Sequence, residues 1–364
     1  MTASTSDLMP IEHIDDWDKR LARQDAAWDC EIIDRPVLHM SVGRPNPDYP
    51  PPAERQYDSL RERWFDTERV VEQAVHRSMN TLFLGDSLPS TYPNLGPEIF
   101  SAYFGQELEY GERTSWSIPF IDDWNDIDHV EFSRENSYYL KIEEMTEALL
   151  AAGKGKFYTG YTDLHPGGDC LAAFRDPQQL NFDMIENLDA VKAMLTHVED
   201  VFLEVFDHYT NYLRSQGQAI ATWPGIQSSK RWHVPSNDFS CMISNKMFED
   251  VFLPDIAREC RHAEASIYHL DGPDALRHLD ALLEIPELNA IQWVYGAGNG
   301  RATDWLDVYK KCQAAGKGIQ LGVGLDELDT IIDELKPEGV FLGVGVKSEE
   351  EADDLLAEFD ISAP

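Results

Sequence analysis

The sequence predicts an α/β fold built as a single (β/α)8 TIM barrel with an N-terminal helical extension. Two observations lead to this prediction. Short apolar runs rich in β-branched and aromatic residues alternate along the chain with longer amphipathic segments, which is typical of repeated βα units. Eight such runs occur in the 364 residues, each leading toward a helical segment, and this number favours one barrel over an open sheet.

The expected elements follow one another in a regular order. Strands are expected at residues 37–42, 81–85, 156–162, 219–223, 266–270, 290–294, 318–323 and 339–344. Helices are expected at residues 66–78, 141–152, 189–216, 245–263 and 349–358. Ser244 and Ser348 stand directly before two of these helices and have the residue type of an N-cap.

The chain is expected to divide into a short arm and the barrel. Residues 15–27 are compatible with a helix but precede the first strand, so we expect residues 1–30 to form an arm and residues 31–364 to form the barrel. Residues 45–54 contain prolines at positions 45, 47, 50, 51 and 52, which predicts an irregular loop or a polyproline stretch.

Composition excludes several classes of function. Asp and Glu number 66 against 30 Lys and Arg, a formal net charge of −36 that repels nucleic acid and acidic membrane surfaces. The five cysteines are scattered without a C-x-x-C spacing, so neither a disulfide framework nor a cysteine zinc site is expected. No window approaches the ~20 apolar residues of a membrane span, and the N-terminus is polar and acidic. We therefore expect a cytoplasmic protein.

The motif with the clearest chemistry is residues 266–273, SIYHLDGP, an apolar run that ends in His269, Asp271 and a Gly-Pro turn. Residues i and i+2 of a strand point to one face, so His269 and Asp271 are expected to project together from the strand's carboxyl end. Ligands and chemistry lie at this end of barrel strands. Imidazole and carboxylate both bind divalent ions, which makes the pair a candidate metal site. Alternatively, His269 bonds Asp271 or a backbone carbonyl and only closes the strand.

Polar and aromatic residues also follow the other expected strands. Asp86, His269 and Asp271 are the catalytic candidates, and the candidates for substrate binding are Arg44, Tyr161, Asp163, His165, Trp223, Asp238, Gln292 and Trp293. The aromatic members are suited to wall a pocket for a planar ring or a sugar face, although packing in the core or at its rim is the alternative for each of them. Titratable groups clustered at a barrel mouth usually mark chemistry.

Four segments resemble a known family: residues 36–49 (PVLHMSVGRPNPDY), 81–87 (TLFLGDS) with 94–96 (NLG), 238–254 (DFSCMISNKMFEDVFLP) and 269–272 (HLDG). They are similar to the uroporphyrinogen decarboxylase superfamily, which contains the decarboxylase and zinc-dependent methyltransferases that work with corrinoid proteins. The resemblance covers almost the whole chain and implies a (β/α)8 barrel. It is strongest for a divergent branch often labelled trimethylamine corrinoid protein 2, in which HLDGP and the later HLDALL (residues 278–283) recur.

The chain departs from the decarboxylase pattern in two places. The resemblance implies that Asp86 stabilises positive charge on an electron-rich ring or donates a proton. Ser41, however, stands at the first of two arginines expected in the substrate loop, so only Arg44 remains. The late histidine of the decarboxylase is also missing near residues 343–346. Decarboxylation of a highly carboxylated tetrapyrrole is therefore disfavoured.

The chain also departs from the methyltransferases, in which the resemblance implies a zinc ion held by one His and two Cys. Asp271 stands at the first Cys position, and Val346 or a neighbour stands at the second. A carboxylate can replace a thiolate but valine cannot. A complete metal site therefore needs a further ligand, and the candidates are His165, Asp163, Asp86 and Asp238.

Three functions from different classes remain open. We favour a methyltransferase that acts with a corrinoid protein on a small methylated substrate, with Zn²⁺ or another metal at His269 and Asp271. The first alternative is a metal-independent decarboxylase or lyase for a carboxylated ring or a small acid, with Asp86, Arg44 and a proton-shuttling His269 or His165. The second is a non-catalytic binding barrel. A dimer is compatible with the sequence, which does not fix the oligomeric state.

Overall fold

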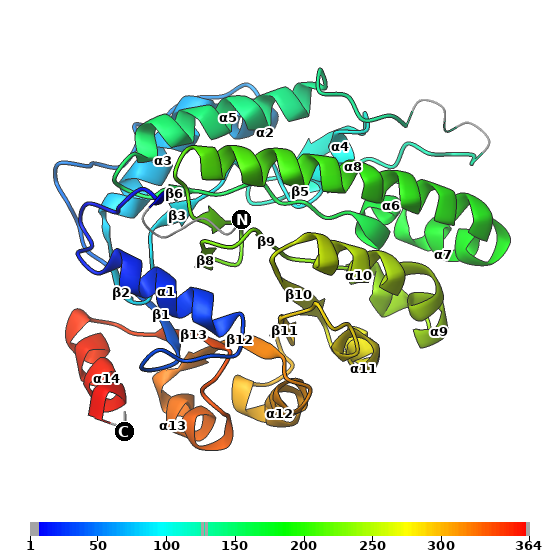
Figure 1. Cartoon of the computed structure of the whole chain (residues 1–364). Helices are drawn as coiled ribbons and strands as arrows, with labels where there is room; N and C mark the ends of the chain where they lie inside the picture. Colours follow the sequence, from blue (N-terminus) through cyan, green and yellow to red (C-terminus); the bar gives the residue numbers. More distant parts are fainter. Residues whose placement is uncertain (1–6, 125–126, 128–129, 362–364) are drawn as a thin grey trace.

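A mostly parallel sheet of seven strands forms the centre of the computed structural model, which describes residues 7–124, 127 and 130–361 (Figure 1). The strand order is β2 (Thr81–Gly85), β1 (Val37–Gly43), β13 (Val340–Gly345), β12 (Gly318–Gly324), β11 (Ala290–Val294), β10 (Ala265–Asp271) and β9 (Trp232–His233). All neighbours run parallel except β1 and β2. Apart from β2, the carboxyl ends of the strands therefore lie at one edge of the sheet.

The second half of the chain repeats one βα unit. Helices α11 (Leu279–Leu283), α12 (Leu306–Ala314), α13 (Leu325–Glu334) and α14 (Glu349–Ile361) follow β10, β11, β12 and β13 in turn. They lie along one side of the sheet (yellow to red in Figure 1). Each of the first three helices buries an apolar face, such as Leu328 and Ile331 of α13. The strands are largely buried, as expected of a parallel sheet that is covered by helices.

The part of the chain that precedes β9 is mainly helical. The long helices α3 (Thr67–Met79), α5 (Ser137–Gly153) and α8 (Leu188–Ser215) belong to it, and α3 packs against α5. The remaining helical segments of this part are α1 (Trp17–Ala27), α2 (Leu60–Phe65), α4 (Ile99–Ala102), α6 (Gly167–Arg175) and α7 (Pro177–Glu186). After β9 come the 3-10 turn η2 (Asp238–Met242), α9 (Asn245–Met247), the π-helical turn η3 (Phe248–Phe252), α10 (Leu253–His262), and the 3-10 turns η4 (Ala275–His278) and η5 (Ala302–Trp305).

In the described ranges, six short strands lie outside the main sheet. Strand β3 (Ser90–Thr91) pairs with β6 (Tyr158–Thr159), β4 (Leu108–Tyr110) with β5 (Ser115–Ser117), and β7 (Ile220–Ala221) with β8 (Gln227–Ser228). Single hydrogen bonds connect some of these short strands to one another and to the main sheet. Tyr161 N donates to Ala221 O (3.0 Å), and Trp232 Nε1 of β9 donates to Ile220 O of β7 (2.8 Å). These contacts run from β6 through β7 to the β9 edge of the main sheet.

The structure confirms all eight expected strands, two of them with the expected bounds: β2 and β11. The expectation of parallel strands throughout is wrong for β2. Arg44 N, just after β1, donates to Asn80 O (2.7 Å), so α3 returns the chain to the carboxyl end of β1. Strand β2 must then run back along β1, from Thr81 opposite Gly43 to Gly85 opposite His39.

The expected helices also occur, with one interruption. Residues 245–263 are divided into α9, η3 and α10. Pro254 lies in the first turn of α10 and has no N–H to donate to the preceding turn, which accounts for the break. Ser244 and Ser348 cap as expected, because their Oγ atoms accept hydrogen bonds from Met247 N (3.3 Å) and Glu351 N (3.2 Å).

The N-terminal segment lies against the rest of the chain. Helix α1 lies within the predicted arm and packs against β1, β8 and β13, so it is not detached. Residues 45–54 contain no helix or strand, as expected. Among the described residues, no helix has both the length and the apolar character that are needed to cross a bilayer.

Candidate functional site

The carboxyl end of β10 presents His269 and Asp271 on one face of the strand. Both side chains are half-buried, whereas Leu270 between them is buried. His269 N donates to Pro235 O (2.9 Å), which fixes the segment before η2 beside β10. Gly272, with φ of +80°, then turns the chain away from the sheet. The local pattern of the sequence therefore produces the paired projection that it predicts.

Asp238 joins this pair. Possible ligand atoms of Asp238, His269 and Asp271 lie within 4.8 Å of one another, and Asp238 is the exposed member of the three. It begins η2, two residues after Ser236, which forms a parallel bridge with His269. The group is one imidazole and two carboxylates, a set of donors found at divalent metal sites.

A chain of amides orients His269. Gln320 Nε2 donates to Pro224 O (3.1 Å), and Gln292 Nε2 donates to Gln320 Oε1 (2.9 Å). Gln292 Oε1 is thus left to accept from His269 Nδ1, at 2.5 Å. Burial lowers the pKa of His269, so its ring is neutral at pH 7 and Nε2 carries the free lone pair.

His165 and Asp163 form a second pair beside this centre. His165 Nε2 lies 2.6 Å from Asp163 Oδ1. Burial alone would lower the pKa of His165, but the negative charges of Asp163, Asp169 and Asp238 outweigh it and raise the pKa to about 9. His165 is therefore a cation at neutral pH. The Trp223 ring stands between the two histidines, 6.3 Å from His165 and 5.0 Å from His269 between ring centroids.

An acidic cavity of about 500 Å³ opens next to His165. Its polar lining includes Glu98, His165, Asp169 and Asp238. Although Asp238 is exposed at its surface, partial desolvation and then the charge of Asp169 raise its pKa to about 7, against the opposing effect of His165. The carboxylates therefore repel one another, and a cation in this region relieves the repulsion.

Sequence reasoning missed Asp169. Its carboxylate accepts hydrogen bonds from Ser236 Oγ (2.9 Å) and Phe239 N (3.0 Å). Ser236 lies two residues before Asp238, and Phe239 lies one residue after it. Asp169 thus fixes the backbone that presents Asp238. The Pro-Gly-Gly run at residues 166–168 was the available signal, because it marks a turn directly before an acidic residue in the first turn of α6.

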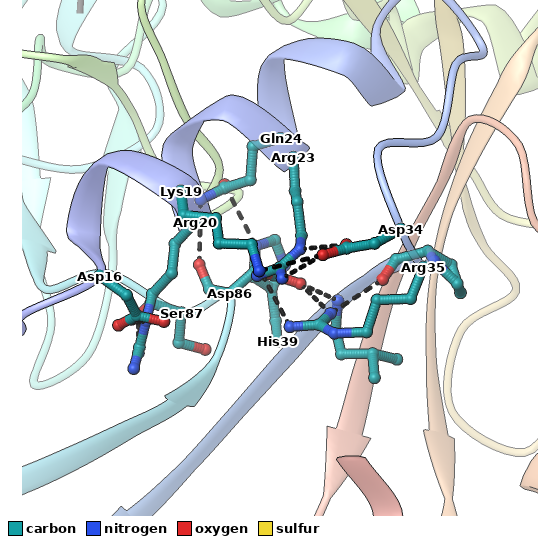
Figure 2. Close-up of polar contacts among 12 residues, drawn as sticks. Asp16, Lys19, Arg20, Arg23, Gln24, Asp34, Arg35, His39, Asp86 and Ser87 are labelled. Carbon is teal, nitrogen blue, oxygen red and sulfur yellow. Dashed lines mark hydrogen bonds and ion pairs between the residues drawn. The ribbon is translucent and has the colours of Figure 1, made fainter. Parts of the chain in front are cut away.

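Asp86 lies in a separate network of buried charges (Figure 2). Its carboxylate accepts from Arg23 Nη1 (3.0 Å), from both terminal nitrogens of Arg35 and from Leu38 N (2.9 Å). The Asp86 side chain has no exposed surface. A carboxylate bound in this way is occupied on both oxygens, so the predicted charge-stabilising or proton-donating role does not fit its placement. The ion pairs with Arg23 and Arg35 favour a structural role for Asp86.

Three other candidates are not members of the group of Asp238, His269 and Asp271. Arg44 is exposed and does not line the acidic cavity. Tyr161 is 1% exposed, and its hydroxyl donates to Trp232 O (3.2 Å). Trp293 is 3% exposed and packs edge-on against Trp305, with ring centroids 5.1 Å apart. Tyr161 is a core residue, whereas Trp293, although largely buried, also lines a cavity together with Gln292. The placement of Arg44 and Asp86 gives no support to a lyase that uses both.

The fold defines an α/β protein with a mostly parallel central sheet and a cluster of titratable side chains at the carboxyl end of its strands. Among solved structures, the chain is similar to a methyltransferase from Methanosarcina mazei, with a TM-score of 0.59 and 13% sequence identity. The match covers 94% of this chain and 98% of that chain, so the two share one architecture over nearly their full lengths. The sequence matches no protein-family model and no curated protein.

Proposed function

We propose that the chain is a methyltransferase of the uroporphyrinogen decarboxylase superfamily, which acts on a small methylated substrate together with a corrinoid protein. The observation that carries the proposal is the grouping of Asp238, His269 and Asp271 within 4.8 Å at the carboxyl end of β10. The fold likeness to a methyltransferase supports the same class. We further infer that β3, β6 and β7 close the sheet into a barrel, which the bonds from Tyr161 to Ala221 and from Trp232 to Ile220 support.

The residues at the centre fit a divalent metal ion such as Zn²⁺. One nitrogen and two carboxylate oxygens are suitable ligands, and Gln292 leaves His269 Nε2 as the nitrogen that can bind. When bound, such an ion supplies Lewis-acid polarisation of the heteroatom that carries the methyl group. The set lacks the two thiolates of the zinc methyltransferases, so we do not assign it the activation of a thiol.

The surrounding residues orient the ligands and balance charge. Asp169 fixes the segment that carries Asp238, and Gln292 holds His269 in one tautomer. His165 places a positive charge among carboxylates that would otherwise repel one another. A reduced corrinoid on the partner protein would supply the nucleophile that accepts the methyl group. The substrate heteroatom keeps the bonding electron pair and takes up a proton.

The first test is the metal content of protein that is purified without a metal-binding tag. We expect near-stoichiometric zinc or another divalent ion in the wild type, a loss in His269→Ala and Asp238→Asn, and no loss in His13→Ala, which removes an exposed histidine. Absence of metal from the wild type would contradict the proposed centre. It would favour a metal-independent lyase or a non-catalytic binding protein instead.

The second test is methyl transfer to free cob(I)alamin, which replaces the unidentified corrinoid protein. A panel of small methylated ethers, amines and thioethers is offered as donors, and formation of methylcobalamin is followed by absorbance. We expect turnover with the wild type and with His13→Ala, and none with His269→Ala. Turnover that survives in His269→Ala would remove the imidazole from the mechanism.

A further inference from the structure

A second cavity, of about 570 Å³, differs from the acidic one in its lining. It lies between β1, β2, β11, β12 and β13 and the turn at Pro224 and Gly225. The chain has 66 acidic residues, yet no Asp, Glu or Lys among the described residues lines this cavity. Its permanently charged lining residue is Arg77, which is exposed and donates to Ser90 O (3.3 Å). The volume is in the range of small-molecule sites.

Two glycines keep this cavity open. Gly322 on β12 and Gly343 on β13 are paired in register, and both line the cavity. Neither has a positive φ, and a Cβ added to either would meet no atom closer than 3.7 Å. Backbone conformation and packing therefore do not require glycine at these positions. Glycine weakens a strand interior, and where packing does not demand it, it marks a place where a ligand approaches the backbone.

The amides of Gln292 and Gln320 supply donors to the cavity. Each Nε2 carries two hydrogens, and the contacts among the described residues use one hydrogen of each: Gln292 to Gln320 Oε1 and Gln320 to Pro224 O. Both glutamines line the cavity. One N–H of each amide thus remains for a ligand, and Gln292 connects the cavity directly to His269.

His39 supplies an acceptor. Gln24 Nε2 donates to Asp86 O (3.0 Å), so Gln24 Oε1 faces His39 Nε2 at 3.1 Å and accepts its hydrogen (Figure 2). Burial lowers the pKa of His39 to about 4, so the ring is neutral. Its Nδ1 therefore carries a lone pair. His39 lines the same cavity, which thus holds fixed donors and an acceptor but little charge.

We propose that this cavity binds an uncharged, hydrogen-bonding small molecule, and that this molecule is the substrate of the centre at His269. The second clause rests on the proposed function, whereas the first does not. A cationic ligand would lose its hydration here without a counter-charge, at a large cost, and an anionic ligand would find only the exposed guanidinium of Arg77, where solvent screening makes an ion pair weak. An uncharged ligand with one acceptor and one donor matches the two glutamines and His39, and such a polar site discriminates strongly against molecules that leave its groups unpaired.

The proposal is tested with three probes of one shape, 3-methoxybenzamide, 3-methoxybenzoate and 3-methoxybenzylammonium, whose dissociation constants are measured by ligand-observed NMR. We expect the wild-type protein to bind the amide at least about tenfold more tightly than either ion. Equal or tighter binding of the benzoate, through Arg77, would overturn the proposal. Preference for the ammonium probe, or failure of the amide to bind at millimolar concentration, would overturn it as well.

Two variants locate the binding. Gly322→Leu fills the cavity and should abolish binding of the amide, whereas Gly43→Leu, at a strand glycine with open space that does not line the cavity, should leave it unchanged. Gln320→Glu should weaken binding of the amide and strengthen binding of the ammonium probe, each by about tenfold. Gln179→Glu adds the same charge on the surface and should leave both dissociation constants unchanged. Amide binding that persists in Gly322→Leu would place the ligand elsewhere and refute the inference.

The binding experiment separates this inference from the proposed function, because it needs neither metal nor turnover. Selective amide binding that Gly322→Leu abolishes, in a protein without metal or methyl transfer, would support the cavity and contradict the proposed function. Metal-dependent methyl transfer that is unaffected by Gly322→Leu would support the proposed function and contradict the cavity as the site of the substrate.

Discussion

Asp86→Ala distinguishes a structural carboxylate from a catalytic one. The wild-type side chain is fully buried and binds Arg23, Arg35 and Leu38 N. After its removal, Arg23 keeps both of its bonds to Asp34, at 2.6 and 2.7 Å. Arg35 is 8% exposed, and within the described part of the chain the side-chain hydrogen bond that it keeps is the one to Pro36 O at 3.0 Å. The main cost therefore comes from the orphaned Arg35.

The magnitude follows from this difference. Removing one partner of a buried ion pair costs about 3–5 kcal/mol, because it leaves an uncompensated buried charge. The comparison variant is Asp34→Ala, which breaks a pair whose carboxylate is 32% exposed and should cost about 1 kcal/mol or less. The double variant Asp86→Ala with Arg35→Met removes the orphaned cation and should recover part of the loss.

The free energy of unfolding is measured by urea titration, and methyl transfer to cob(I)alamin is measured on the same samples at a temperature where each variant is folded. We expect the loss of stability in Asp86→Ala, and turnover per folded molecule near that of the wild type. If Asp86→Ala kept its stability within about 1 kcal/mol and lost turnover, the structural interpretation would be refuted. Asp86 would then return to the catalytic residues.

Three further predictions address the site and its surroundings. Gln292→Leu removes the acceptor of His269 Nδ1, so we expect affinity for the metal to fall about 10–100-fold in a chelator competition, and unchanged affinity would contradict the orienting role. Because the pKa of His165 is raised from 6.5 to about 9 in the folded protein, its protonation stabilises the fold. This contribution is complete below pH 6.5 and disappears as pH rises through about 9. The stability difference between wild type and His165→Gln should therefore shrink over that window in urea titrations. Burial raises the pKa of Glu199 well above its ordinary value, which makes its contribution to stability decrease as pH rises above about 4.5. Glu199→Gln should therefore be more stable than the wild type at pH 8 and lose this advantage near pH 4, whereas a constant difference would contradict the raised pKa of Glu199.

The sequence predicts the βα half of the fold well because its signals are local. A buried parallel strand such as β11 is a short continuous apolar run between helices, and its bounds agree with the prediction. The direction of β2 could not be predicted in the same way, since it depends on where α3 returns the chain. Strands β3, β8 and β9, which the sequence analysis does not predict, have two residues each, which is too short for any periodic pattern.

The candidate site also contains residues that local sequence predicts and residues that depend on distant contacts. His269 and Asp271 lie two residues apart on one strand, so their common face is a local property. The partners of Asp86 are distant: Arg23 and Arg35 precede it by 63 and 51 residues, and no nearby motif indicates them. Asp169 acts through hydrogen bonds to a segment about 70 residues later, from Phe239 N among others. Interactions of this range require the fold.

The paired glycines of β12 and β13 have a consequence for how this protein could change. The space between them exists because two side chains are absent, and no backbone strain holds them as glycine. A single codon change to alanine, serine or valine at either position would reshape the cavity while the sheet hydrogen bonds stay in place. Ligand preference can therefore diverge among descendants of this chain, or in a directed library at two positions, without first requiring a more stable scaffold.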